Sequence, residues 1–207
     1  MRALLITAGA THNPIDSMRS ITANASGKTG AWFAQQLYLD FEITVMGSQL
    51  AIANNTAPVM EITFTSTRDL EQKMKEWVLK NPNGIVIHSA AVGDYEVRDP
   101  DYEHKISSGQ SELSITLVPA PKILSQLKKW STNLTIVSFK AAPPSTKPSE
   151  LVNIATRQCI SSGSEIVLAN VIGHTHNDVM LVTTSEHEHY LKRKDALKSL
   201  VQHIKGW

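Results

Sequence analysis

The chain has little cysteine, no long hydrophobic run and almost no excess charge of either sign. The one cysteine, Cys159, excludes an internal disulfide framework, and its place on an amphipathic segment favours a buried structural thiol over a nucleophile. No window is long and apolar enough to cross a membrane, and no charged leader with a long apolar run precedes the first predicted strand. The formal net charge of the 207 residues is +1, so nothing indicates nucleic acid or an acidic membrane as a partner. We therefore expect a soluble, cytoplasmic protein with a single domain over residues 1–207.

Glycine-rich phosphate loops are also missing. The stretch SGKT at 26–29 resembles the end of a P-loop, but Thr22 stands where that motif requires its first glycine. The loop TAGATH at 7–12 lacks the three spaced glycines of a dinucleotide fingerprint, which disfavours a nicotinamide oxidoreductase. A helix that begins near Gly27, with Ser26 as its N-cap, would still point free backbone N–H groups at the preceding loop. That loop remains a candidate anion site.

Short apolar runs alternate with amphipathic segments along the chain. Strands are predicted at 1–6, 41–46, 60–64, 85–87, 113–118, 134–139, 166–169 and 180–183, the last at an edge of the sheet. Helices are predicted over 27–39, 67–80, 122–130, 149–160 and 186–204, with Ser149 in the cap of the fourth and a loop over 47–57. This alternation predicts an α/β, Rossmann-like fold: a doubly wound, mostly parallel sheet with helices on both faces.

Four residues follow or end predicted strands and define where a ligand is expected. In doubly wound sheets, ligands collect beyond the carboxyl ends of the strands. Gly9, Ala90, Phe139 and Asn170 all fall at such ends, so we expect them to converge on one composite site. Phe139 is by default a core residue, and its neighbours decide whether it also offers a stacking surface to a base.

Three charged residues outside the strands are candidates for nucleotide chemistry. Asp94 follows a strand by a short loop, where a carboxylate can accept two hydrogen bonds from a ribose diol, although a turn aspartate is an equal alternative. Lys105 lies in the charged segment 96–110, a predicted mobile flap, and either stabilises a phosphorus centre that gains negative charge or is a solvated lysine. Arg19 either clamps a phosphate or carboxylate or forms a surface ion pair with Asp16.

The sequence gives less support to a metal site than to a nucleotide site. His174-x-His176 and His187-x-His189 have a spacing that metal sites use, but no cysteine and no ordered carboxylate joins them. No resident metal is therefore predicted.

Several motifs in a fixed order resemble one family from end to end. They are ITAGATHNPID followed by Arg19 and SGKTG, AAVGDY at 90–95, KISS at 105–108, VPAPKI at 118–123, VSFK at 137–140 and LAN at 168–170. On these motifs the chain resembles phosphopantothenate-cysteine ligase, also called phosphopantothenoylcysteine synthetase, in the short stand-alone form found in some bacteria. That family uses a nucleoside triphosphate to convert 4'-phosphopantothenate, on the way to coenzyme A, into an acyl-nucleotidylate. The amine of L-cysteine then attacks this intermediate.

The resemblance implies a role for each matching residue. Those implied to bind the nucleotide are Ser89, Ala90, Asp94, Lys105, Ala120, Pro121, Lys122 and Phe139, with Lys105 acting on the α-phosphate. Those implied to bind 4'-phosphopantothenate are Gly9, Asp16, Arg19, Ser26, Gly27, Lys28, Ala91 and Asn170. The resemblance also implies CTP or ATP as co-substrate, Mg²⁺ with the triphosphate, and a homodimer in which Arg19 reaches into the site of the partner.

Two departures from the family pattern leave alternatives open. Ala23 stands where the family has an asparagine that helps convert the acyl-nucleotide intermediate, and Asn24 follows one place later. Asn24 is therefore a candidate catalytic residue beside Lys105, and a catalytically impaired homologue is the alternative function. The basic residues that approach the base in cytidine-using relatives fall near Gln158 and Ser162, which are uncharged. The choice between CTP and ATP stays open.

Overall fold

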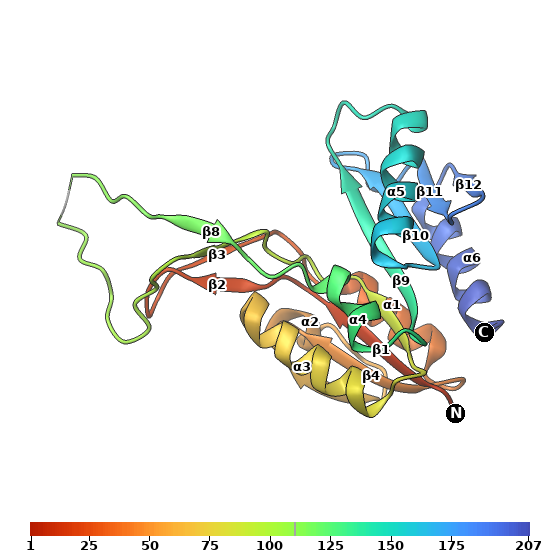
Figure 1. Cartoon of the computed structure of the whole chain (residues 1–207), viewed down its shortest axis with the longest axis horizontal. Helices are drawn as coiled ribbons and strands as arrows, with labels where there is room; N and C mark the ends of the chain where they lie inside the picture. The colour runs from red at the N-terminus through yellow and green to blue at the C-terminus, as the bar shows by residue number, and fades with distance from the viewer. Residues whose placement is uncertain (110) are drawn as a thin grey trace.

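A computed structural model describes residues 1–109 and 111–207, and an eight-stranded sheet forms its centre (Figure 1). The strands of this sheet are β1 (Ala3–Ala8), β4 (Glu42–Gly47), β5 (Met60–Thr63), β6 (Ile85–His88), β9 (Thr135–Ala142), β10 (Ile166–Val171), β11 (Val179–Val182) and β12 (His187–Tyr190). Their spatial order is β12-β11-β10-β9-β6-β1-β4-β5. The first six in chain order pair in parallel, and β11 and β12 extend the sheet antiparallel. The predicted α/β class with a mostly parallel sheet is confirmed.

Helices cover both faces of the sheet. They are α1 (Lys28–Leu37), α2 (Gln49–Ala53), α3 (Thr67–Lys80), the 3-10 helix η1 (Ile123–Gln126), α4 (Leu127–Trp130), α5 (Pro148–Ser162) and α6 (Arg193–Lys205). Because successive side chains of a strand point to opposite faces, Leu4 and Ile6 of β1 pack in the core under α1 and α6. Leu5 packs in a second core with α3 and α4, and Val167 of β10 in a third with α5. The sheet is therefore doubly wound, as predicted.

A long arm extends from this body (Figure 1). It consists of residues 12–22, 95–109 and 111–119, which contain two antiparallel pairs: β2 (His12–Pro14) with β3 (Ser20–Thr22), and β7 (Tyr95–Val97) with β8 (Leu117–Pro119). The side chain of Asn13 joins the pairs, since its Nδ2 donates to the carbonyl of Tyr95 at 2.8 Å. The predicted flap 96–110 belongs to the arm, and its residue 110 lies outside the described residues.

Several predicted elements were wrong in place or kind. The helix predicted over 186–204 is a strand followed by a helix, so the strand predicted at 180–183 is not at the edge: β12 is. Segment 47–57, predicted as a loop, contains α2, whose N-cap Ser48 accepts a hydrogen bond from the amide of Ala51. The hairpin β2–β3 was not predicted, and the strand predicted over 113–118 is only three residues long.

Two helix starts also differ from the prediction. Ser26 is not the cap of α1, because Gly27 occupies the N-cap position and no side chain caps that helix. Likewise Lys147, and not Ser149, precedes the first turn of α5, with a proline in that turn. The side chain of Lys147 has no oxygen that could accept from the first turn, so α5 begins without the hydroxyl cap that the sequence suggested.

Cys159 is buried, and its Sγ lies 3.3 Å from the carbonyl oxygen of Val182. Burial raises the pKa of this thiol, so it stays protonated at neutral pH. The predicted buried structural cysteine is confirmed. Within the described residues, no helix has the length and apolar character needed to cross a membrane.

Candidate functional site

The strand order reverses next to β1, and the candidate site lies there. β1 pairs with β4 on one side and with β6 on the other, so the loops that follow β1 and β6 leave the same edge of the sheet. These two loops are joined by backbone hydrogen bonds: the amide of Ala91 donates to the carbonyl of Gly9 at 2.8 Å, and that of Thr11 to the carbonyl of Ala91 at 3.1 Å. Two residues predicted for the phosphopantothenate side, Gly9 and Ala91, are thus in direct contact.

Two glycines, Gly9 and Gly27, allow the start of α1 to approach the loop that follows β1. Gly9 and Gly27 have φ angles of +84° and +78°, a backbone conformation that favours glycine. A Cβ atom on Gly9 would lie 2.1 Å from Oγ of Ser48, and one on Gly27 would lie 2.2 Å from Cβ of Ala51. Both loops therefore pack against α2 with no room for a side chain. The first turn of α1 has no side-chain cap, so its free backbone N–H groups suit an anion. We call this place, where the start of α1 at Gly27 meets the loop at Gly9, the crevice.

Beside the crevice lies a cavity of about 290 Å³ at the ends of β6 and β9. Among the residues predicted to bind a nucleotide, those that line it are Ala90, Asp94, Pro121, Lys122 and Phe139. Nζ of Lys122 forms an ion pair with the carboxylate of Asp94, and the amide of Ala120 donates to the Asp94 carbonyl at 2.9 Å. Of the four strand-end residues expected to converge, Ala90 and Phe139 line this cavity, whereas Gly9 and Asn170 are not among its lining residues.

Phe139 belongs to both the core and the cavity wall. Its ring meets that of Phe33 edge-on, with 6.2 Å between the ring centroids, while the residue also lines the cavity. Phe139 is therefore packed against the core, as expected by default, and its role as a stacking surface for a base stays a prediction.

A polar row crosses the sheet beside the cavity, and two of its members, His88 and Ser138, line the cavity. Thr7, His88 and Ser138 are in register across β1, β6 and β9. Oγ1 of Thr7 lies 2.9 Å from Nδ1 of His88, and Nε2 of Gln158 donates to Oγ of Ser138 at 2.9 Å. His88 lines the cavity and was missed by the sequence analysis. The available signal was a histidine that ends the otherwise apolar strand IVIH.

Burial sets the charge of His88. It lowers the pKa of the imidazole to about 4 from its ordinary value of 6.5, so the side chain is neutral at pH 7. A neutral imidazole at this position offers the cavity a hydrogen-bonding group without adding positive charge.

The same burial predicts a pH dependence of stability. Below pH 6.5 the unfolded chain protonates His88 while the folded chain does not, so folding stability falls between pH 6.5 and 4 and levels off below pH 4. Between pH 7.5 and pH 5 this residue should remove about 2 kcal/mol from the free energy of unfolding. Urea titrations of the chain and of His88→Gln at both pH values measure it. The loss should be about 2 kcal/mol smaller in His88→Gln but unchanged in His187→Gln, which alters an exposed histidine; equal losses in all three would contradict the assignment.

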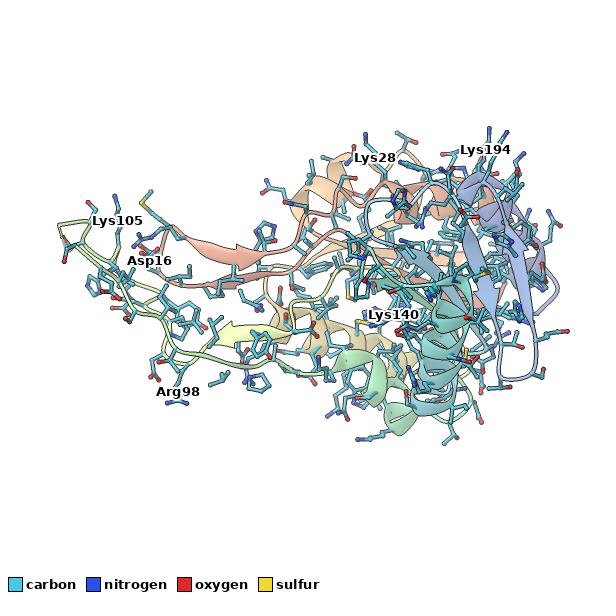
Figure 2. The ribbon with its side chains drawn as sticks, turned by 90° about the horizontal axis from the view of Figure 1, so that it is seen from above. Asp16, Lys28, Arg98, Lys105, Lys140 and Lys194 are labelled. Atoms are coloured by element: carbon cyan, nitrogen blue, oxygen red, sulfur yellow. The ribbon has the colours of Figure 1, made fainter. Side chains whose placement is uncertain are left out.

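Three predicted residues lie far from this cavity within one chain. Figure 2 shows Lys105 and Asp16 at the outer end of the arm, whereas Lys140, which lines the cavity, is in the body. Arg19 accompanies them, because its guanidinium is hydrogen-bonded to Asp16.

The other predicted residues lie closer to the crevice but differ in exposure. Ser89 is fixed by a hydrogen bond from its Oγ to the carbonyl of Thr7 at 2.6 Å. Asn170 is buried near the end of β10, where Nη1 of Arg193 donates to its Oδ1 at 3.0 Å. The exposed residues of the segment that enters α1 are Asn24, Ser26 and Lys28.

Comparisons with known proteins agree with this architecture. A crystal structure of the DNA/pantothenate metabolism flavoprotein from Streptococcus pneumoniae matches with a TM-score of 0.87 and 23% identity, over 100% of this chain and 99% of that one. It shows a shared fold. The Coenzyme A biosynthesis bifunctional protein CoaBC of Thermococcus kodakarensis is 30% identical over 185 residues, which are 87% of this chain and 45% of that protein. The phosphopantothenate–cysteine ligase of Homo sapiens is 30% identical over 123 residues, 58% of this chain and 39% of that protein.

The alignments cover less than half the length of both curated relatives. The sequence model of the DNA/pantothenate metabolism flavoprotein C-terminal domain matches residues 1–205, nearly the whole chain. The joined loops at the strand reversal and the cavity beside them are thus features of a chain that this model matches almost completely. The chain belongs to the family of the DNA/pantothenate metabolism flavoprotein C-terminal domain.

Proposed function

We propose that the chain is a phosphopantothenate-cysteine ligase of coenzyme A biosynthesis, which joins 4'-phosphopantothenate to L-cysteine through an acyl-nucleotidylate. One observation carries the proposal: the loop after β6 borders the cavity and is also hydrogen-bonded to the loop after β1. Ala90 lines the cavity, and the next residue, Ala91, is bonded to Gly9 in the crevice. A phosphate-bearing acid in the crevice and a nucleotide in the cavity would therefore meet at this loop, which is the geometry that nucleotidyl transfer to a carboxylate needs.

The proposed reaction has two steps, and one leaving group departs in each. In the first, a carboxylate oxygen of 4'-phosphopantothenate bonds to the α-phosphorus of CTP or ATP, and the bond to pyrophosphate breaks. In the second, the amine of L-cysteine bonds to the acyl carbon, the nucleoside monophosphate leaves with the bonding electrons, and the amine gives up a proton. Asp94 would bind the ribose hydroxyls, and the residues that would hold phosphopantothenate include Gly9, Ser26, Gly27, Lys28, Ala91 and Asn170.

Mg²⁺ would enter with the triphosphate. Among the described residues, no group of three or more histidine, cysteine, aspartate or glutamate side chains is arranged to hold a metal ion. Phosphate oxygens and water are the ligands that Mg²⁺ commonly uses in such sites, so the ion would be carried by the nucleotide.

A second copy of the chain would complete the site. Figure 2 shows Lys105 and Asp16 at the end of the arm, away from the cavity of their own chain, and Arg19 is hydrogen-bonded to Asp16. Apolar side chains are exposed along the arm: Met18, Tyr95, Tyr102, Leu113, Ile115 and Leu117. An extended arm with exposed apolar side chains is typical of a surface that another chain covers. We propose a homodimer in which the arm of each chain brings Lys105 and Arg19 to the cavity of the other.

Pyrophosphate release tests the function and the choice of nucleotide together. Purified protein with Mg²⁺, 4'-phosphopantothenate, L-cysteine and either CTP or ATP should release pyrophosphate and form the amide. Omission of phosphopantothenate should abolish release, because the acid whose carboxylate attacks the α-phosphorus is then absent. Absence of release with both nucleotides would refute the proposal.

A further inference from the structure

We propose that Asp16 is a positioning residue that fixes the segment around Lys105 to Arg19 at the end of the arm, and that it does not contact substrate; this rests on the proposed function, in which Lys105 acts on the α-phosphate. The resemblance alone assigned Asp16 to phosphopantothenate. The structure gives its carboxylate a different set of partners.

Both oxygens of Asp16 are saturated by donors from the arm itself. Oδ1 accepts hydrogen bonds from the amides of Met18, at 2.9 Å, and Arg19, at 2.8 Å. Oδ2 accepts from Nε of Arg19 at 3.0 Å, from Nη2 at 2.5 Å, and from the amide of Ile106 at 3.0 Å. The side chain is fully buried. A carboxylate with five donors and no exposed surface has no capacity left for a ligand.

These bonds hold the backbone on both sides of Lys105. Ile106, the next residue, donates its amide to Asp16 and accepts from Nη2 of Arg19 at 3.1 Å through its carbonyl. His104, the preceding residue, accepts at its carbonyl from the amide of Ser17 at 3.3 Å. The backbone of Lys105 is therefore tied to the hairpin β2–β3 at two points, while its side chain stays exposed.

Among the charged side chains at the end of the arm, that of Lys105 is the one proposed to meet an anionic ligand. Asp16 and Arg19 neutralise one another, and the hydrogen bond from Arg19 holds the pKa of Asp16 far below its ordinary value, so the pair persists across the physiological range. Asp101 faces His104 at 3.4 Å. Lys105 forms no ion pair with any residue of the ranges 1–109 and 111–207, so its charge remains available for a phosphate.

Asp16→Asn changes these bonds selectively. An asparagine keeps one oxygen, which can still accept from the amides of Met18 and Arg19. Its NH₂ group would then face the amide of Ile106 and the guanidinium of Arg19, all of them donors, so the bonds to Ile106 would be lost. The substitution therefore weakens one of the two attachments of the segment around Lys105 and leaves the backbone bond from Ser17 to His104, with almost no change in volume.

The first test measures how firmly the segment around Lys105 is held, and it requires no catalytic turnover. In hydrogen exchange, Asp16→Asn should raise the exchange rate of the Ile106 amide about tenfold or more, while that of Val86 in the sheet is unchanged. Trypsin should also cut faster after Lys105. Asp40→Asn, which alters an ion pair with Lys205 far along the sequence, should change neither. Unchanged exchange at Ile106 in Asp16→Asn would overturn the proposal, and equal acceleration at Val86 would show general unfolding and overturn it as well.

The second test separates positioning from ligand binding. In single turnovers, Asp16→Asn should slow nucleotidylate formation by about 10- to 100-fold, a larger factor than any loss of affinity for 4'-phosphopantothenate that follows because Arg19 also loses its partner. Added to Lys105→Gln, it should cause no further loss, because both act through the same amine. Loss of phosphopantothenate affinity with an unchanged chemical step, or losses that multiply in the double variant, would overturn it. If the unaltered chain released no pyrophosphate, the proposed function would fail, whereas the exchange result would still report on the positioning of the segment.

Discussion

Replacement of Lys105 by glutamine should slow acyl-nucleotidylate formation by about 100- to 1000-fold, the range found when one donor to a transition-state charge is removed. The α-phosphorus gains negative charge on its oxygens as the carboxylate attacks, and in the proposed dimer the exposed ammonium of Lys105 would oppose that charge. Since glutamine keeps the length and polarity of the side chain, the loss should fall on the chemical step. Quenched-flow measurement of pyrophosphate release in one turnover reports it directly.

The matched control is Lys75→Gln, an exposed lysine on α3 that has no hydrogen bond among the described residues. Its rate should equal that of the unaltered chain, and both variants should bind 4'-phosphopantothenate as the unaltered chain does. A normal single-turnover rate in Lys105→Gln would refute the role of this residue, while leaving the ligase assignment to the pyrophosphate assay.

Replacement of Gly9 by alanine should lower the free energy of unfolding by about 3 kcal/mol, as the sum of two costs. Left-handed backbone disfavours a side chain, and the added Cβ would lie 2.1 Å from Oγ of Ser48 and 2.9 Å from Cβ of Ala51. Relief of that overlap must move Ser48 away from the amide of Ala51, which it caps. We therefore also expect loss of phosphopantothenate binding, because the crevice loses its shape. Urea unfolding and calorimetric titration measure the two effects.

Gly173 offers a control for the backbone contribution alone. Its φ is +87°, close to that of Gly9, but a Cβ atom would meet nothing within 4 Å. Gly173→Ala should therefore cost only about 1 kcal/mol and leave binding intact. If Gly9→Ala lowered the free energy of unfolding no more than Gly173→Ala does, the close approach of the loop to α2 would not matter for stability.

The central strands could be predicted because their signal is local. The apolar runs of β1, β4, β6 and β10 are buried on both faces, and short continuous apolar runs indicate such strands directly. β12 could not be found this way. Its sequence HEHY is polar and mostly exposed, so it is a strand only because β11 offers it a partner edge. The hairpin β2–β3 is similar, since pairing within the arm, and not residue preference, creates it.

The candidate site was also predictable only in part. Parallel strands bring Gly9 and Ala91 to one edge, and this follows from fold class alone. The place of Lys105 does not follow, because it depends on bonds between residues about 90 positions apart, such as that from Ile106 to Asp16. His88 was missed because a histidine that ends a buried strand looks like core until its neighbours across the sheet, Thr7 and Ser138, are known to be polar.

The central place of β1 has a consequence for synthesis on the ribosome. β1 is made before both of its partners, and its second edge stays unpaired until β6 is complete at His88, 80 residues after Ala8. At ordinary elongation rates this takes roughly 4 to 16 s. During that time five of its six residues, all buried in the finished sheet, present an apolar strand edge to other nascent chains. This short segment is therefore the part of the growing polypeptide most exposed to aggregation and most in need of a chaperone.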